Sequence, residues 1–435
     1  MKFKNTCFIV CLSALVGACG GSEEAESDAA GEPIKVGVLH SLSGSMAISE
    51  TTLKDTIEMM VDEQNARGGL LGRQLEAVVV DPASDWPLFA ERARELLESE
   101  QVDVVFGCWT SVSRKSVLPV FEELNGLLFY PVQYEGEESS RNVIYTGAAP
   151  NQQAIPAVNY LANEVGIERW VLEGTDYVYP RTTNRILEAY LKEELGVADE
   201  DISINYTPFS HSDWQTRVSE IRDFGSEGKR TAVVSTINGD ANVPFYLELA
   251  NQEVSAEDIP VVAFSVGEEE LSGLDTTPLV GHLAAWNYFQ SIEGAVNSEF
   301  IANWKQRMGA DRTTNDPMEA HFIGFNMWVA AVEQAGTTDV DAVLEALPGT
   351  ETQNLTGGIA RLLPNHHLTK PVFIGEVRAD GQFDVVWQTD GLVEGDAWTD
   401  FLPGSRDTQA DWVDPEINCG NYNTQTGECS ATNFQ

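Results

Sequence analysis

The sequence predicts an α/β protein of two doubly wound, parallel-sheet lobes with a hinge and a central cleft. From Ile34 to about Ala285, short β-branched apolar segments alternate with amphipathic segments of helical period. Strands that are separated by helices of about 10 to 15 residues pair in parallel and are covered by helices on both faces. These strand–helix units are too many for one comfortable sheet, so the pattern indicates two.

The elements are expected in a regular order along the chain. The first strands are expected at 34–39, 75–80, 102–106 and 127–130, with helices at 53–67, 86–99 and 111–124. The same rhythm predicts strands at 170–173, 203–206, 232–236 and 261–264, with helices at 155–165, 182–195, 214–224 and 243–251. After Trp286 the pattern predicts helices at 299–308, 318–335 and 340–347, then strands at 359–363, 372–377 and 383–388.

Two lobes on one chain require crossings between them. We expect the first lobe to contain residues 34–149 and about 287–345, and the second lobe to contain 150–286 and about 346–399. The segment Ala149-Pro150-Asn151 is the expected first crossing. Residues 400–435 are rich in Asp, Asn, Thr and Gly, which is typical of a surface extension.

The N-terminus predicts export. In residues 1–18, Lys2 and Lys4 precede an apolar stretch that is shorter than the roughly 20 residues a membrane span needs, as in a signal peptide. The end of this stretch, VGAC, resembles the cleavage box of bacterial lipoproteins, which implies a lipid on Cys19. Residues 19–33 then form a flexible acidic tether. An extracytoplasmic, lipid-anchored protein is expected, and an ordinary signal peptide with a chance Cys is the alternative.

The charge balance excludes some partners. The 435 residues carry 26 Lys and Arg against 68 Asp and Glu, a formal net charge of −42. Such a surface repels the phosphate backbone of nucleic acid and lacks a basic face for a membrane. Only nine basic residues are Lys. An acid-rich, Lys-poor surface is typical of a saline habitat, where salt screens self-repulsion, although an ordinary acidic soluble protein has the same composition.

The cysteines suggest a disulfide and no metal. In an oxidising compartment, Cys419 and Cys429 can close a short loop. Metal binding by this pair is not expected, because no His or second Cys pair lies nearby. We expect Cys108 to be a small buried apolar residue, the pair His366-His367 to lie in a solvated loop, and the protein to need no cofactor.

The loops that follow the predicted strands are the place to look for a ligand. In open parallel sheets, ligands bind beyond the carboxyl ends of the strands. These loops are rich in aromatic and hydroxyl side chains and have few basic groups. Tyr and Ser hydroxyls, Asn side chains and backbone amides suit a small, neutral, polar ligand. A phosphate would instead need Arg, Lys or a glycine-rich loop.

Seven segments in order carry a family resemblance. They are GCWTSVSRKSVLPVFE, LLFYPVQYEG, YTGAAPNQQ, TDYVYPRTTN, INGDANV, AAWNYFQSI and TNDPMEA. Together they resemble the substrate-binding lipoproteins of urea ABC transporters and the related short-chain amide-binding proteins. The resemblance covers about Ile34 to Val386, and the CGNYN…GEC tail fits it. It implies a type 1 periplasmic binding fold that closes on urea or a small amide and delivers it, unchanged, to a membrane permease.

The resemblance also implies which residues bind the ligand. From one lobe these are Trp109, Ser111, Tyr130, Val132 and Gln133, and from the other Tyr177, Tyr179 and Asp240. Urea is planar and neutral, so carboxylate and Tyr oxygens can accept its amine hydrogens while aromatic faces stack on its plane. Each role has a structural alternative. Trp109 and Tyr130 can be core residues, and Ser111 and Asp240 can be helix caps.

Other functions remain open at this point. A binding protein for branched-chain amino acids would need a carboxylate for the ammonium group and donors for the carboxylate. A periplasmic amidase is less favoured, because the sequence has no G-x-S-x-G or H-E-x-x-H motif and Cys108 has no obvious His partner. A sensor domain that feeds a regulator is disfavoured by the predicted export signal.

Overall fold

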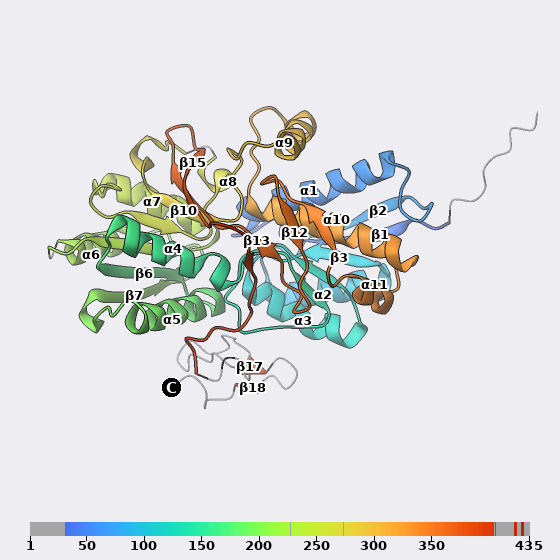
Figure 1. The fold of residues 1–435 in the computed structure, drawn as a ribbon, viewed down its shortest axis with the longest axis horizontal. Helices are drawn as coiled ribbons and strands as arrows, with labels where there is room; N and C mark the ends of the chain where they lie inside the picture. The colour runs from blue at the N-terminus through green and yellow to red at the C-terminus, as the bar shows by residue number, and fades with distance from the viewer. Residues whose placement is uncertain are drawn as a thin grey trace, which may run out of the picture.

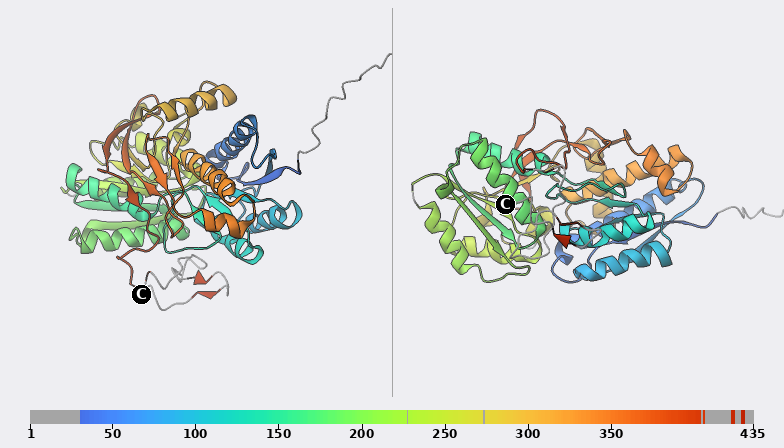
Figure 2. Two further views of the ribbon diagram at one scale, coloured as in Figure 1. Left: turned by 45° about the vertical axis from the view of Figure 1, so that its right-hand side comes forward. Right: turned by 90° about the horizontal axis from the view of Figure 1, so that it is seen from below.

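The computed structural model describes residues 31–226, 228–272, 274–403 and 405, and the backbone of 422–423 and 428–429. In this part the chain forms two α/β lobes that lie side by side (Figures 1 and 2). The predicted signal peptide, the lipid attachment at Cys19 and the side chains of Cys419 and Cys429 lie outside the described residues.

The first lobe has a five-stranded parallel sheet in the order β2-β1-β3-β4-β5. Its strands are β1 (Ile34–Leu39), β2 (Leu75–Val80), β3 (Val104–Gly107), β4 (Leu128–Tyr130) and β5 (Val143–Tyr145). Its helices are α1 (Ala47–Ala66), α2 (Trp86–Arg94), α3 (Ser111–Leu124), α9 (Ala295–Met308), α10 (Asp316–Ala335) and α11 (Val340–Ala346). β3 and β4 are fully buried, and β1 is buried except at Lys35, because helices cover both faces of the sheet.

The second lobe has a seven-stranded sheet in the order β15-β14-β10-β9-β8-β6-β7. Its strands are β6 (Arg169–Thr175), β7 (Ile202–Thr207), β8 (Thr231–Thr236), β9 (Val261–Ala263), β10 (Leu283–Trp286), β14 (Phe373–Val377) and β15 (Phe383–Gln388). Its helices are α4 (Ala154–Tyr160), α5 (Val178–Glu193), α6 (Gln215–Gly225), α7 (Asn242–Asn251) and α8 (Glu268–Leu271). All pairs are parallel except those of β14 with β10 and β15, which are antiparallel.

Smaller elements complete the described chain. They are the strand pairs β11 (Glu351–Gln353) with β12 (Ile359–Arg361), β13 (Thr369–Lys370) with β16 (Val393–Glu394), and β17 (Tyr422–Asn423) with β18 (Glu428–Cys429). Short helical turns are η1 (Glu95–Ser99), η2 (Pro150–Gln152), η3 (Leu161–Val165), η4 (Asp199–Asp201), η5 (Gly239–Ala241) and η6 (Thr277–Leu279). Among the described residues, no helix combines the length and the apolar character that a bilayer span requires.

The third boundary between the lobes falls later in the chain than the sequence predicts. Leu347, Ala360, Leu362 and Leu368 share one core with the strands of the first lobe and with α10. Residues 347–368 therefore pack with the first lobe, whereas we expected the second lobe to resume at about residue 346. The cause is the β11–β12 pair, which packs beside α10 instead of extending the second sheet.

One side chain connects all three crossings between the lobes. The side-chain amide of Asn287, at the second crossing, donates to the carbonyl of Gln152 at 3.0 Å and to that of Pro371 at 2.7 Å. Gln152 belongs to the first crossing and Pro371 to the third. The backbone N–H of Asn287 donates to the carboxylate of Asp316 at 2.8 Å. The three connections are therefore held together at one point, which we call the hinge node.

Candidate functional site

The carboxyl ends of the two sheets face each other, and side chains from the following loops meet there. The indole of Trp109, after β3, donates to the amide oxygen of Asn238, after β8, at 3.4 Å. The amide of Gln133, after β4, donates to the hydroxyl of Ser265, after β9, at 2.7 Å. With Tyr179, these four residues form a buried set that we call the inter-lobe group.

A second set of contacts closes the lobes beside this group. The hydroxyl of Ser49, in α1, donates to the carboxylate of Glu270, in α8, at 2.7 Å. The backbone N–H of Asp240 donates to the carbonyl of Ser45 at 3.2 Å. The described conformation is thus one in which the lobes touch each other directly.

Tight backbone geometry places Trp109 at the end of β3. A Cβ on Gly107 would lie 2.6 Å from the carbonyl oxygen of Leu39, so only glycine fits there. Cys108 has a φ of 66°, which turns the chain sharply before Trp109. The hydroxyl of Tyr130 then donates to the carbonyl of Trp109 at 2.5 Å. Tyr130 therefore holds the Trp109 loop in place.

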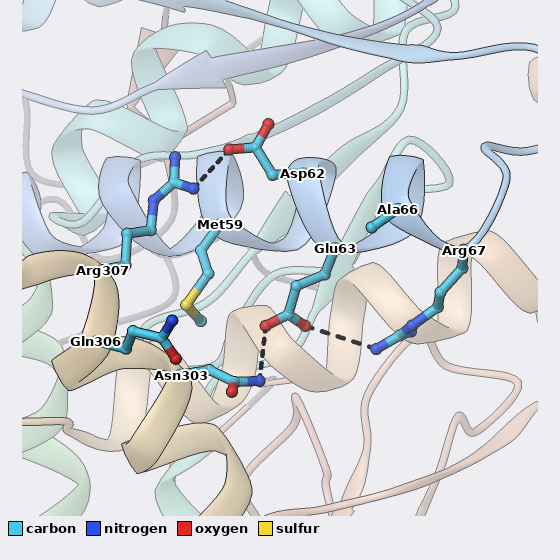
Figure 3. Close-up of a pocket in the computed structure, with 8 residues that line it drawn as sticks. All are labelled: Met59, Asp62, Glu63, Ala66, Arg67, Asn303, Gln306 and Arg307. Carbon is cyan, nitrogen blue, oxygen red and sulfur yellow. Dashed lines mark hydrogen bonds and ion pairs between the residues drawn. The ribbon is translucent and has the colours of Figure 1, made fainter.

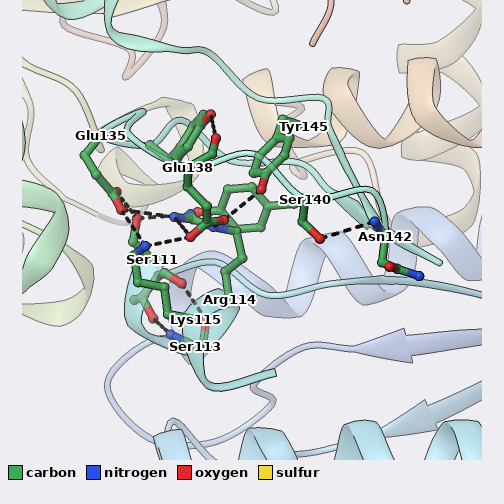
Figure 4. A network of polar contacts seen from close by, with 12 residues as sticks. Ser111, Ser113, Arg114, Lys115, Glu135, Glu138, Ser140, Asn142 and Tyr145 are labelled. Carbon is green, nitrogen blue, oxygen red and sulfur yellow. Dashed lines mark hydrogen bonds and ion pairs between the residues drawn. The ribbon is translucent and has the colours of Figure 1, made fainter. Parts of the chain in front are cut away.

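Ser111 is not the cap of its helix. The cap of α3 is Thr110, whose hydroxyl accepts from the backbone N–H of Ser113 at 3.1 Å. The hydroxyl of Ser111 donates instead to the carboxylate of Glu135 (Figure 4). The capping alternative for Ser111 is thus wrong, because the preceding residue already performs that role.

Behind Ser111 lie four buried charged side chains that we call the charge network: Arg114, Lys115, Glu135 and Glu138 (Figure 4). Arg114 donates to Glu138 at 2.8 Å and pairs with Glu135 at 3.0 Å, while Lys115 donates to Glu138 at 2.6 Å. Burial alone would raise the pKa of Glu138, but Arg114 and Lys115 outweigh that effect and hold it below its ordinary value.

Aromatic rings enclose the guanidinium of this network. The guanidinium carbon of Arg114 lies 4.7 Å from the centre of the Tyr130 ring and 4.6 Å from that of Tyr134. The hydroxyl of Tyr145 donates to Glu138 at 2.8 Å. Cation–π contact and a buried hydrogen bond thus fix the network under the loop that carries Tyr130 and Gln133.

The second lobe contributes Tyr177 and Tyr179 at the start of α5. Both are buried, and the ring of Tyr177 packs on Phe209 with centroids 4.8 Å apart. Burial raises the pKa of both Tyr177 and Tyr179, and the negative charge of Glu135 adds to the rise. Hydrogen bonding to Gln133 and Ser265 opposes it at Tyr179, and the charge of Arg114 opposes it at Tyr177. The field of the charge network therefore reaches across to the second lobe.

Two polar atoms of the inter-lobe group are buried without a hydrogen bond of good geometry among the described residues, although the Tyr179 hydroxyl lies near enough to Gln133 and Ser265 for both to lower its pKa. They are the side-chain oxygen of Gln133 and the hydroxyl of Tyr179. A buried polar atom without a partner costs roughly 1–3 kcal/mol. Such atoms are where a polar ligand would gain most by binding.

The remaining predicted residues, Val132 and Asp240, differ in their burial. Val132 is buried in the same core as Tyr130. A Cβ on Gly147 would lie 2.0 Å from the carbonyl oxygen of Val132, so only glycine fits at position 147. Asp240 is exposed, and its carboxylate accepts from the hydroxyl of Ser210 at 3.1 Å. It does not cap α7 either, since the residue before that helix is Ala241. The structure therefore brings together the predicted residues of both lobes except Asp240, and the role of each of them in ligand binding stays a prediction.

Sequence reasoning overlooked Arg114, Glu135, Asn238 and Ser265 as members of this site. A signal was present, because Arg114, Lys115, Glu135 and Asn238 all lie within the segments that carry the resemblance. Arg114 and Lys115 both belong to α3, which begins two residues after Trp109. Their burial follows from the tertiary contact of α3 with the loop after β4, which the sequence pattern does not display.

A second buried polar cluster lies in the first lobe. Glu50 accepts from the backbone N–H of Ser41 at 2.8 Å and contacts His40, whose other ring nitrogen lies 2.8 Å from a ring nitrogen of His321. Burial lowers the pKa of His321 well below its ordinary value. In the part of the chain that is described, no group of three or more His, Cys, Asp or Glu side chains is arranged to hold a metal ion.

The hollow between α1 and α9 is a different kind of feature (Figure 3). Arg307 pairs with Asp62, while Glu63 accepts from Asn303 and pairs with Arg67. These side chains satisfy one another across an open surface. The hollow therefore lacks the buried, unsatisfied groups that distinguish the inter-lobe group.

Comparison with known proteins now identifies the family. The sequence matches the family described as the periplasmic binding protein domain over residues 34–404. The chain belongs to the periplasmic binding protein family. This confirms the predicted type 1 fold and assigns the protein to a family of extracytoplasmic binding proteins.

Relatives of this periplasmic binding protein are distant. A Leu/Ile/Val-binding protein homolog from Brucella melitensis biotype 1 is 21% identical over 359 residues, which cover 81% of this chain and 90% of that protein. A limonene hydroxylase from Geobacillus stearothermophilus is 33% identical over 110 residues. That match covers 25% of this chain and only 20% of the hydroxylase, so it carries no argument about activity.

Solved structures agree on the fold. A solute-binding protein of an ABC transporter from Rhodopseudomonas palustris, in complex with 3,4-dihydroxybenzoic acid, has a TM-score of 0.70 and 17% identity. The match covers 83% of this chain and 98% of that one. A leucine-binding protein from Thermotoga maritima has a TM-score of 0.69 and 17% identity, covering 82% and 98%.

Proposed function

We propose that this periplasmic binding protein is the solute-binding component of an ABC importer, and that it closes on urea or a similarly small neutral amide. The observation that carries the proposal is the chemistry of the inter-lobe group. It consists of an indole, two side-chain amides and two hydroxyls, all buried where the lobes meet. Neutral groups of this kind hydrogen-bond a neutral polar solute without leaving a charge unpaired.

The two atoms of that group that lack a well-formed hydrogen bond favour an amide in particular. The side-chain oxygen of Gln133 accepts hydrogen bonds, and the hydroxyl of Tyr179 both donates and accepts. Urea and short amides carry N–H donors beside a carbonyl acceptor, so one small ligand serves both atoms. The faces of Trp109 and Tyr177 match the planar shape of such a ligand. An analogue without the amine would leave the Gln133 oxygen unpaired.

A branched-chain amino acid is the second candidate ligand. Its support is the 21% identity with a Leu/Ile/Val-binding protein homolog over most of both chains. A zwitterion needs a carboxylate for its ammonium group and a donor for its carboxylate. Arg114 and Lys115 are each engaged by Glu138 within the charge network, which disfavours this candidate.

The proposal includes how the solute is handled. Closure of the lobes on the ligand shifts a population between open and closed forms, and the closed form presents both lobes to a permease. The solute leaves unchanged. We also propose export and attachment to a bacterial membrane through a lipid on Cys19, which mass spectrometry of the mature protein tests.

Calorimetric titration with urea, formamide, acetamide, leucine and 4-hydroxybenzoate tests the ligand. We expect binding of urea or a short amide, and a gain of about 2.7 kcal/mol in stability at a hundredfold excess over Kd. Binding of leucine or 4-hydroxybenzoate without any amide would refute the assignment. Ammonia released from a bound amide would refute the non-catalytic role.

A further inference from the structure

The charge network beside the candidate site contains equal numbers of cations and anions. Arg114, Lys115, Glu135 and Glu138 are all buried, and the most exposed of them, Lys115, is 5% exposed. Inside a protein, an uncompensated charge is strongly disfavoured, whereas paired charges are tolerated. The network by itself is therefore neutral, and the neighbouring Glu137 is a further buried carboxylate, which accepts from the backbone N–H of Thr399 at 3.0 Å and from the hydroxyl of Ser405 at 2.7 Å.

The pairing within the network is uneven. Glu138 accepts from both Arg114 and Lys115 at short distances, and it also accepts from Tyr145. Glu135 pairs with Arg114 at 3.0 Å but lies 4.0 Å from the Lys115 ammonium. Glu135 is thus the anion whose charge is less fully neutralised.

Glu135 is also the member that faces the other lobe. It accepts from Ser111 at the start of α3, and it lies two residues after Gln133, whose amide crosses to Ser265. Burial is the main cause of the raised pKa of Tyr177 and of Tyr179 in the second lobe; the negative charge of Glu135 adds to it in both, and Arg114 opposes it at Tyr177. Any ligand held by Gln133 and Tyr179 lies within the field of this carboxylate.

We propose that the positive charge of Lys115 and the negative charge of Glu135 together determine which ligand charge the closed site accepts. With the two charges equal, the site binds neutral solutes and rejects charged molecules of the same shape. The proposal rests on the function proposed above. Glu135 affects the electrostatic potential of the site directly, because it lies at the edge of the site. Lys115 affects that potential through its ion pair with Glu138. Removing Glu135 leaves the network with a net positive charge, and removing Lys115 leaves it with a net negative charge. A ligand whose charge has the other sign would then neutralise the network.

Two variants of nearly unchanged volume change the balance in opposite directions. Glu135→Gln leaves an excess positive charge and should favour acetate relative to acetamide. Lys115→Met leaves an excess negative charge and should favour guanidinium relative to urea. We expect each affinity ratio to change by at least about tenfold, because charges act strongly where water is excluded. The double variant restores the balance and should return both ratios toward those of the parent.

The measurement is calorimetric titration of the full chain with acetamide, acetate, urea and guanidinium at one pH and ionic strength. The controls are Glu123→Gln and Lys192→Met, which make the same chemical changes at exposed or half-exposed pairs on α3 and α5. Neither control should alter the ratios. Circular dichroism checks folding. If one single variant does not fold, the other single variant must still shift in its assigned direction, and the double variant must fold and regain the parental ratios.

The outcomes separate the two proposals. Amide binding with unchanged ratios in the variants overturns the charge-balance proposal and leaves the proposed function standing. If the parent protein prefers acetate or guanidinium to its neutral isostere, or binds none of the four, both proposals fail.

Discussion

At the scale of single residues, Tyr130 illustrates how a predicted ligand residue acts through another. Its hydroxyl is committed to the carbonyl of Trp109, and its ring covers the guanidinium of Arg114. Tyr130 therefore fixes the position of the indole.

Tyr130→Phe should lower both stability and ligand affinity. The change leaves the buried Trp109 carbonyl without its hydrogen bond, a loss of about 1–3 kcal/mol in the free energy of unfolding, and it frees the indole to move. Thermal unfolding and amide titration measure the two effects. Tyr190→Phe, at a ring that packs on Phe401, should leave affinity unchanged. Parental affinity and melting temperature in Tyr130→Phe would contradict this role.

Variants of Gln133 and Ser265 distinguish two contributions to ligand affinity: the hydrogen bond between the lobes and the direct contact of Gln133 with the ligand. Ser265→Ala removes the hydrogen bond between the lobes but keeps the side-chain oxygen of Gln133, so affinity should fall by only about 0.5–1.5 kcal/mol. Gln133→Leu removes both and should cost more. Titration of the two variants with the same amide gives the comparison. Equal losses would mean that the Gln133 oxygen does not contact the ligand.

At the scale of elements, the hinge node makes the three crossings a single mechanical unit. Asn287→Leu removes both side-chain hydrogen bonds, to Gln152 and to Pro371. We expect a lower melting temperature and a broader spread of lobe orientations, which small-angle scattering of the ligand-free protein would detect as a larger radius of gyration. Asn326→Ala removes an amide that bonds only within α10 and should not change the scattering.

The sequence pattern predicts long, regular elements well and short ones poorly. β5 was overlooked because it has three residues and follows β4 without a helix between them, so no periodicity marks it. The strands β14 and β15 were expected, but their antiparallel pairing was not, since direction depends on how the chain returns to the sheet. The resemblance predicts which motif residues bind the ligand, whereas the contacts of Asn238 and Ser265 across the lobes depend on the tertiary structure and leave no mark in the sequence pattern.

At the scale of the whole molecule, buried ionisable groups lower the free energy of unfolding at both alkaline and acidic pH. Burial raises the pKa of Glu268 to about 8 and that of Glu319 to about 7. Both groups bind protons more tightly when folded, so their contribution to stability is lost as pH rises from about 4.5 through these values. Burial lowers the pKa of His282 and His367 to about 4. Their contribution is lost as pH falls from about 6.5 toward 4.

Glu268→Gln tests the alkaline side of this dependence. One carboxylate oxygen of Glu268 accepts from the backbone N–H of Gln290 at 2.7 Å, and an amide keeps that acceptor without a charge to develop. The melting temperature of the variant should fall less between pH 6 and pH 8 than that of the parent. Glu76→Gln, at an exposed position on β2, should follow the parent. An equal fall in Glu268→Gln and the parent would contradict the assignment.

The net charge of −42 adds a dependence on salt. Self-repulsion among exposed carboxylates destabilises the compact state, and at 1 M salt the screening length shrinks to about 3 Å. We expect the melting temperature to rise steadily from low to molar salt. A constant melting temperature over that range would indicate an ordinary acidic surface and remove the inference of a saline habitat.

The interleaving of the lobes also determines when the protein can fold during synthesis. The core of the first lobe joins β1 to α10, and the second sheet is finished only by β14 and β15 near its edge. Neither half is complete until nearly the whole chain has left the ribosome, and such long-range contacts form slowly. We therefore expect a nascent polypeptide of this kind to remain incompletely folded until late in synthesis, which suits passage through a narrow translocation channel.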